Sequence, residues 1–166
     1  MYINSELQKI YNALYKGEAT LPYILLCLDP GHTTGYSVFK AGCFVEAGQI
    51  GTVASDDSIY WDRVSELFSR VKPTEVVMED YRVYSHKLER HSFSRVPTLR
   101  LIGAIDFICH QSGIPVHYQM ATQAKGFITD EKLKKYGLYD QGQRHSRDSM
   151  RHGLYYMIAT HPKLFK

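Results

Sequence analysis

The stretch Ile24-Leu25-Leu26-Cys27-Leu28-Asp29-Pro30-Gly31-His32-Thr33-Thr34-Gly35 decides the fold of this chain. Its five consecutive apolar residues, from Ile24 to Leu28, are typical of a fully buried β-strand. The strand ends in a carboxylate, and the Pro-Gly pair that follows turns the chain back at once. Because a buried charge is costly without compensation, Asp29 predicts a cation nearby, either a basic side chain or a metal ion.

A second buried strand also ends in an acid. Glu75-Val76-Val77-Met78-Glu79 follows a helical pattern over residues 58–72, which Pro73 ends. A strand that follows a helical crossover is expected to run parallel to the first strand, and the carboxyl ends of the two then meet at one edge of the sheet. We therefore expect Asp29 and Glu79 to lie side by side at a metal-holding edge.

The remaining patterns predict an α/β fold. Residues 35–39 and 43–50 extend the first strand into an antiparallel meander. Four further segments follow: a helix from Pro97 to Gly113, a strand at 114–118, a mainly helical stretch at 122–136 and a last helix at 146–160. This order predicts a mixed central sheet, an antiparallel meander followed by parallel strands, with helices on both faces. The length of 166 residues suits a single domain over 1–166, with an extra N-terminal helix at 4–17.

Composition limits the class of protein. No run approaches the ~20 apolar residues that a membrane helix needs, so we expect no membrane partner. The N-terminus has no basic start and no apolar core of a secretory signal. Three widely spaced cysteines, an odd number, favour a reducing compartment over a disulfide scaffold. We therefore expect a cytoplasmic protein.

Charge is distributed unevenly along the chain. Residues 1–81 hold 6 Lys/Arg against 11 Asp/Glu, and residues 82–166 hold 14 against 6. A basic half is typical of a polyanion-binding protein, although a solvated surface explains it equally well. The polar, basic and aromatic stretch 80–96 is expected to be a long surface loop. Its cations interleave with Tyr84 and Phe93, a combination that favours DNA contact through Lys87, Arg90 and Arg95.

The third chemical feature is His145-Ser146-Arg147-Asp148. Residues three apart share one face of a helix, so His145 and Asp148 are expected to point the same way. The pair alone is weak evidence, because most such pairs cap helices or lie on surfaces. Arg147, Arg151 and His152 lie close by in the sequence, and both phosphate contact and an ordinary structural role are open for them.

Taken together, the three features indicate a metal site. Carboxylates this close repel one another and take up protons unless a cation separates them. Carboxylate oxygens with water suit Mg²⁺, and one imidazole shifts the preference slightly toward Mn²⁺. Two ions roughly 3.5–4 Å apart activate water and stabilise the leaving oxygen of a phosphodiester, so we expect two ions per site.

The three motifs resemble those of RuvC-type Holliday junction resolvases, which have the RNase H-like fold. The motifs are Leu28–Gly35, Val76–Glu79 and His145–Ser149, and the resemblance runs from about Leu25 to Ile158. It is closest to small divergent versions from bacteriophages, which implies the host cytoplasm as the location if a bacteriophage encodes the protein. It implies a homodimer that cuts four-way DNA junctions symmetrically with divalent metal. It implies metal ligands at Asp29, Glu79, His145 and Asp148, with the basic Lys125 near the scissile phosphate. It places junction contacts after the second acid, at Tyr81, Arg82 and Tyr84.

The chain departs from the family pattern at two positions, and three further functions are compatible with parts of the sequence. Many relatives carry an acid where His145 stands, and an alanine where Ser149 stands. Actin-like ATPases and sugar kinases also begin with an Asp-Gly-x-Thr loop, but they need a second domain, for which 166 residues leave no room. A nuclease of the same fold that processes RNA and a nucleic-acid binder of that fold without catalytic activity both stay open.

Overall fold

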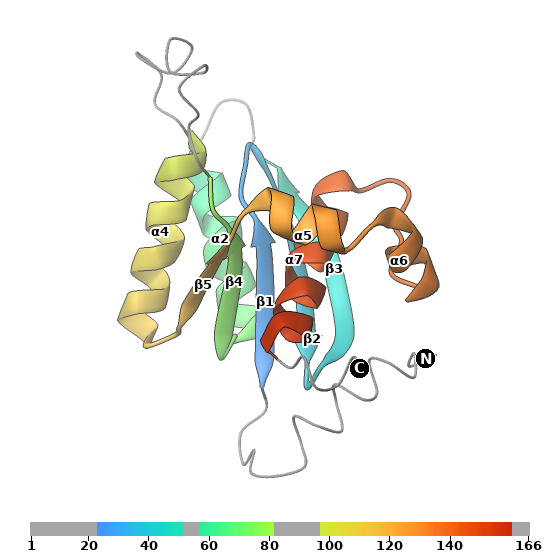
Figure 1. Cartoon of the computed structure of the whole chain (residues 1–166). Coiled ribbons are helices and arrows are strands. Elements are labelled where there is room, and N and C mark those ends of the chain that lie inside the picture. Colours follow the sequence, from blue (N-terminus) through green and yellow to red (C-terminus); the bar gives the residue numbers. More distant parts are fainter. Residues whose placement is uncertain (1–22, 52–56, 82–96, 161–166) are drawn as a thin grey trace.

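The computed structural model describes residues 23–51, 57–81 and 97–160, and these form one mixed sheet with helices on its two faces (Figure 1). The five strands lie in the order β3-β2-β1-β4-β5. Their bounds are β1 Ile24–Asp29, β2 Thr33–Lys40, β3 Cys43–Gly51, β4 Glu75–Glu79 and β5 Val116–Gln119. The helices are α2 Asp57–Val71, α4 Pro97–Ser112, α5 Ala121–Phe127, α6 Asp130–Lys135 and α7 Arg144–Thr160.

The strand pairing confirms the predicted sheet. β1 pairs with β2 and β2 with β3 in antiparallel fashion, which makes the meander. β1 pairs with β4 in parallel, and β4 with β5 likewise. The register places Leu28 opposite Met78 and Glu79 opposite Gln119. The carboxyl ends of β1, β4 and β5 therefore meet at one edge of the sheet.

Alternation along β1 divides the core into two clusters. Leu26 and Leu28 pack with the buried residues of α2 and α4. Leu25 and Cys27 pack on the opposite face, with buried residues of α6 and α7. Because side chains alternate along a strand, Asp29 belongs to the α7 face of the sheet.

The predicted helix over 122–136 is two helices in the structure. α5 ends at Phe127 and α6 begins at Asp130. Thr129 caps α6, because its side-chain oxygen accepts a hydrogen bond from the Lys132 amide. Ile128, between the two helices, is fully buried in the α7-side cluster. Burial of Ile128 and capping by Thr129 together outweigh continuation of one helix.

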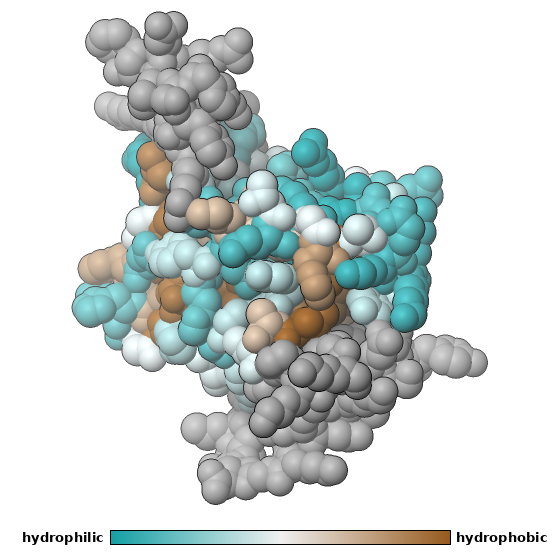
Figure 2. Space-filling model, in the orientation of Figure 1, coloured by the Kyte–Doolittle hydropathy of each residue, from teal (hydrophilic) through white to brown (hydrophobic). Residues whose placement is uncertain are grey.

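Most of the remaining boundaries differ by one or two residues, and β5 begins at Val116 rather than Ile114. The predicted helix at 4–17 lies outside the described residues. Within the described ranges, no helix is long and apolar enough to cross a membrane. On the face shown in Figure 2, hydrophilic residues prevail over the region of α6.

Candidate active site

Two strands deliver the first pair of carboxylates. Asp29 is the last residue of β1 and is only 6% exposed. Glu79 is the last residue of β4, the parallel neighbour of β1. The apolar residues of both strands are buried, and each acid is the first polar residue after them, at the carboxyl end of its strand. The predicted meeting of the two acids is what the register of the strands produces.

Helix α7 adds the other two predicted residues in its first turns. His145 Nδ1 lies 2.8 Å from Asp29 Oδ2, and its backbone N–H donates to Gln49 Oε1 at 3.1 Å. Asp148 is 3% exposed, one turn further along. The start of α7 lies very close to β2, since a Cβ added at Gly35 would be 1.9 Å from the carbonyl oxygen of His145. Gly35 is therefore needed because any side chain at this position would clash with the start of α7.

Lys125 of α5 joins the two pairs. Its Nζ lies 3.2 Å from Glu79 Oε2 and 3.1 Å from Asp148 Oδ2. The structure thus gathers Asp29, Glu79, His145, Asp148 and Lys125 around one point of the sheet edge. The ammonium of Lys125 lies between two carboxylates and offsets part of their negative charge, and Asp29 lies beside them.

The acids hold their protons unequally. Burial and the neighbouring charge of Glu79 raise the pKa of Asp29 from 3.8 to about 6. Burial also acts to raise the pKa of Glu79, but the hydrogen bond from His152 and the charge of Lys125 outweigh it and lower that pKa to about 2. The charge of Glu79 opposes ionisation of Asp29, so the two pKa values depend on one another. Without further positive charge nearby, Asp29 stays protonated at pH values at which an ordinary aspartate is ionised.

The ammonium of Lys125 is held in its charged form. Burial acts to lower the pKa of Lys125, but the charges of Glu79 and Asp148 outweigh burial and raise it. Lys125 therefore stays a cation at physiological pH. A fixed positive charge at this point is suited to an anionic ligand such as a phosphate.

Two further polar residues lie at the site: the sequence pattern leaves the role of His152 open and does not point to Gln119. His152, one turn after Asp148, is fully buried and lies 3.1 Å from Glu79 Oε2 and 3.0 Å from Gln119 Oε1. A fully buried side chain with these two partners is not placed to contact a phosphate, so its contacts favour a role within the fold. Gln119 ends β5 at the same edge as Glu79. The seven-residue spacing from His145 to His152, two helical turns, is the signal that was available in the sequence.

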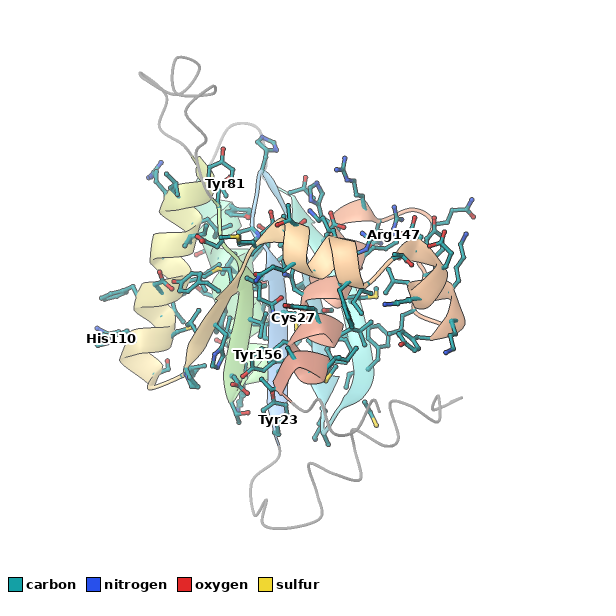
Figure 3. All side chains as sticks on the ribbon, in the orientation of Figure 1. Tyr23, Cys27, Tyr81, His110, Arg147 and Tyr156 are labelled. Carbon is teal, nitrogen blue, oxygen red and sulfur yellow. The ribbon has the colours of Figure 1, made fainter. Side chains whose placement is uncertain are left out.

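The arginines of α7 are also engaged within the fold. Arg151 pairs with Asp148 and with Asp130 of α6, and its Nε donates to the Ile128 carbonyl oxygen at 3.0 Å. Its side chain is 12% exposed. Arg147, labelled in Figure 3, donates to the Asp140 carbonyl oxygen and lies over the Tyr139 ring. Arg151 therefore ties α6 to α7 and leaves Asp148 with one oxygen on Lys125 and one on Arg151 itself.

A hydrogen-bonded network supports the turn that follows Asp29. The Tyr60 hydroxyl of α2 is buried against the Thr34 hydroxyl and donates to the Gly31 carbonyl oxygen at 3.1 Å. The Gly31 N–H in turn donates to Thr34 Oγ1 at 3.3 Å. These bonds connect the turn to the helix on the opposite face of the sheet. The position of Asp29 is thus fixed from both sides of β1.

The donor set has the chemistry of a divalent-metal site. Three carboxylates and one imidazole converge, and burial together with the charge of Glu79 raises the pKa of Asp29. In the conformation described, Lys125 stands between Glu79 and Asp148, and no group of three His, Cys, Asp or Glu side chains in the described ranges has the geometry of a metal site. The residue types fit Mg²⁺ or Mn²⁺, and the fit requires Lys125 to move aside.

The predicted DNA contacts fall mostly on residues that the structure leaves undescribed. Tyr81, labelled in Figure 3, follows β4 directly and is partly exposed. The other five, Arg82, Tyr84, Lys87, Arg90 and Arg95, lie outside the described residues. Tyr81 therefore marks the point at which the predicted DNA-contacting loop begins, two residues after Glu79.

This sheet order, with acids at the ends of its two central parallel strands, defines an RNase H-like fold. Among solved structures, the chain is similar to Thermus thermophilus RuvC in complex with a Holliday junction substrate. That match has a TM-score of 0.63 and 17% identity over 83% of this chain and 95% of that chain. A second structure of RuvC from Thermus thermophilus matches with a TM-score of 0.62 and 18% identity, over 84% and 96% of the two chains. The fold is therefore that of RuvC.

Comparisons of sequence give no further assignment. No protein-family model matches the chain, and no curated protein matches it. The structural likeness concerns the RuvC fold and does not bear on the predicted likeness to bacteriophage versions, which stays a prediction. Activity, substrate and metal have to be argued from the residues of the site.

Proposed function

We propose that this chain is a divalent-metal-dependent endonuclease that resolves four-way DNA junctions by symmetric phosphodiester cleavage. The observation that carries the proposal is the convergence of three carboxylates, His145 and Lys125 at the carboxyl edge of a RuvC-like sheet. Three converging carboxylates call for bound positive charge, which a substrate alone does not supply. A phosphodiester with bound divalent ions supplies the charges that this edge lacks.

Each side chain has a role in the proposed reaction. Asp29, Glu79 and Asp148 hold two Mg²⁺ or Mn²⁺ ions, and His145 either completes the ligand set or orients the attacking water. Bound divalent ions supply Lewis-acid activation of water and of the scissile phosphate. Lys125 leaves the carboxylates and places its ammonium on the non-bridging oxygen of the phosphate, where negative charge develops.

The proposed substrate accounts for symmetry and affinity. A four-way junction has two-fold symmetry, so a C₂ homodimer presents two sites to opposing strands. The basic second half of the chain supplies affinity for the phosphate backbone. The loop after Glu79, from Tyr81 through Arg82, Tyr84, Lys87, Arg90 and Arg95, supplies contacts at the branch point. The solved RuvC complex with junction DNA supports this choice by analogy of fold alone.

A nuclease assay tests the proposal. Labelled four-way, flap and linear duplex DNA, together with a structured RNA, are incubated with Mg²⁺, Mn²⁺ or EDTA. We expect paired nicks at symmetric positions of the four-way junction with either metal, and none in EDTA or with Asp29→Asn. Cleavage of the RNA alone would move the function to RNA processing. Junction binding without any cleavage would leave a non-catalytic binder.

A further inference from the structure

One buried side chain beside the site has no role in the function proposed so far. His152 is completely shielded from solvent, and both of its ring nitrogens lie within hydrogen-bond distance of polar atoms. Nε2 is 3.1 Å from Glu79 Oε2, and Nδ1 is 3.0 Å from Gln119 Oε1. A buried imidazole with two partners is fixed in orientation, because rotation of the ring would leave two polar groups unsatisfied.

The partners of His152 determine which nitrogen donates. A carboxylate oxygen only accepts hydrogen bonds, so the Nε2 that faces Glu79 must carry a hydrogen. The Gln119 amide satisfies Nδ1 in either orientation of its oxygen and nitrogen. Gln119 is itself 6% exposed, and its backbone pairs with Glu79 in the sheet. Hydrogen bonds therefore connect Gln119 of β5 to His152 of α7, and His152 to Glu79 of β4.

The bonds that Glu79 receives from Lys125 and His152 fall on the same oxygen. Lys125 Nζ lies 3.2 Å from Glu79 Oε2, and His152 Nε2 lies 3.1 Å from that atom. Oε1 receives neither of them. When Lys125 moves aside for a cation, His152 still donates to Oε2, because its ring is buried and held by Gln119. An oxygen that accepts such a fixed N–H donor is the poorer cation ligand, and Oε1 is the better one. Oε2 of Glu79 thus accepts hydrogen bonds from the protein, and Oε1 is the oxygen left for a cation.

We propose that His152 is a positioning residue that anchors Glu79 through Oε2, so that Oε1 is the oxygen presented to a divalent cation. The inference rests on the proposed function, because it assigns His152 a role toward the metal of that site. His152 touches no reacting atom. It acts as the outer hydrogen-bonding partners of metal ligands do, by orienting a ligand, and loss of such a partner typically lowers metal affinity ~10–100-fold.

Two substitutions separate this role from a merely structural one. Gln places its side-chain N–H close to the position of histidine Nε2, so His152→Gln keeps the bond to Glu79 and loses the bond to Gln119. Asn places its N–H close to the position of Nδ1, so His152→Asn keeps the opposite bond. Both replacements are polar and leave one partner unsatisfied at the same buried position. They form a matched pair that differs in which bond survives.

The measurement is Mn²⁺ binding by calorimetry on the full chain, with thermal unfolding in EDTA as the test of folding. We expect His152→Gln to bind Mn²⁺ within a few-fold of the unsubstituted chain, and His152→Asn to bind ~10–100-fold more weakly. Equal losses, no losses or the reverse order would overturn the positioning role. An unsubstituted chain that binds no Mn²⁺ would instead contradict the proposed function.

A third variant keeps the test decisive if the histidine replacements do not fold. Gln119→Met leaves His152 and its bond to Glu79 in place and removes only the distant partner. We expect a loss of Mn²⁺ affinity smaller than that caused by Glu79→Gln, and a normal unfolding transition. A loss as large as that of Glu79→Gln would place the anchor at Gln119 and overturn the assignment to His152.

Discussion

Asp29→Asn is expected to stabilise the metal-free protein while it abolishes the proposed cleavage. Burial and Glu79 raise the pKa of Asp29 from 3.8 to about 6, so the folded chain resists ionisation of this group. A rise of this size corresponds to about 3 kcal/mol when the group is fully ionised. Asparagine resembles the protonated acid in shape and donor capacity, and it retains a partner for His145. We expect a gain of about 1–3 kcal/mol above pH 7.

The sign follows from linkage between protonation and folding. The folded state binds the Asp29 proton more tightly than the unfolded state. The loss of stability caused by the ionised Asp29 is therefore complete above about pH 6 and disappears as the pH falls from about 6 to 3.8. The advantage of the Asn variant over the unsubstituted chain should therefore be largest at pH 8 and absent near pH 4. For a chain of this length, 1 kcal/mol shifts Tm by about 2–4 °C.

The assay is thermal and urea unfolding of both chains in EDTA at pH 4, 6 and 8, with Asp62→Asn as the control. Asp62 lies exposed on α2, away from the carboxylates, and its replacement should change stability by less than about 0.5 kcal/mol. Saturating Mn²⁺ should reverse the order, because it stabilises only the chain with the complete ligand set. Equal stability at pH 8, or a gain that does not vary with pH, would refute the electrostatic reasoning.

Three further predictions concern the same edge. Glu79→Gln in EDTA should destabilise the chain by roughly 1–2 kcal/mol at pH 7, because the hydrogen bond from His152 and the charge of Lys125 lower the pKa of Glu79 and stabilise the folded state above pH 4.5; urea unfolding at pH 7 and pH 3 measures this. Gly35→Ala should lower cleavage ~100-fold by displacing His145, whereas Gly103→Ala, which meets nothing within 4 Å, should leave the rate unchanged in single-turnover assays. Junction affinity should fall at least ~100-fold between ~50 and ~200 mM salt in anisotropy titrations.

Much of the fold could be predicted because its signals are local. The apolar run before Asp29 and the acid that ends it specify a buried strand and its edge, and the helical crossover specifies that β4 is parallel to it. The convergence of Asp29, Glu79, His145 and Asp148 follows from these elements. The break between α5 and α6 did not emerge, because burial of Ile128 depends on packing against α7 that no local pattern carries.

The supporting residues of the site were harder to predict for the same reason. The sequence shows that His152 is near His145 and Asp148. Its burial and its bonds to Gln119 and Glu79, which favour contact with Glu79 over contact with a phosphate, appear only in the fold. Gln119 ends a four-residue strand and carries no motif. Tyr60 reaches the Asp29 turn from the opposite face of the sheet. These contacts connect residues 26 or more positions apart, so sequence spacing contains no trace of them.

The geometry of the site depends on how closely α7 approaches the sheet. A Cβ at Gly35 would lie 1.9 Å from the His145 carbonyl oxygen, and one at Gly153 would lie 2.5 Å from the Phe39 ring. The first glycine sets the distance of the start of α7 from β2, and the second sets the distance of its middle. With the helix fixed at both places, Asp148 and His152 face the edge from one side of α7. The positions of the proposed ligands on α7 therefore depend on two residues that have no functional group, so the geometry of the site follows from helix–sheet packing.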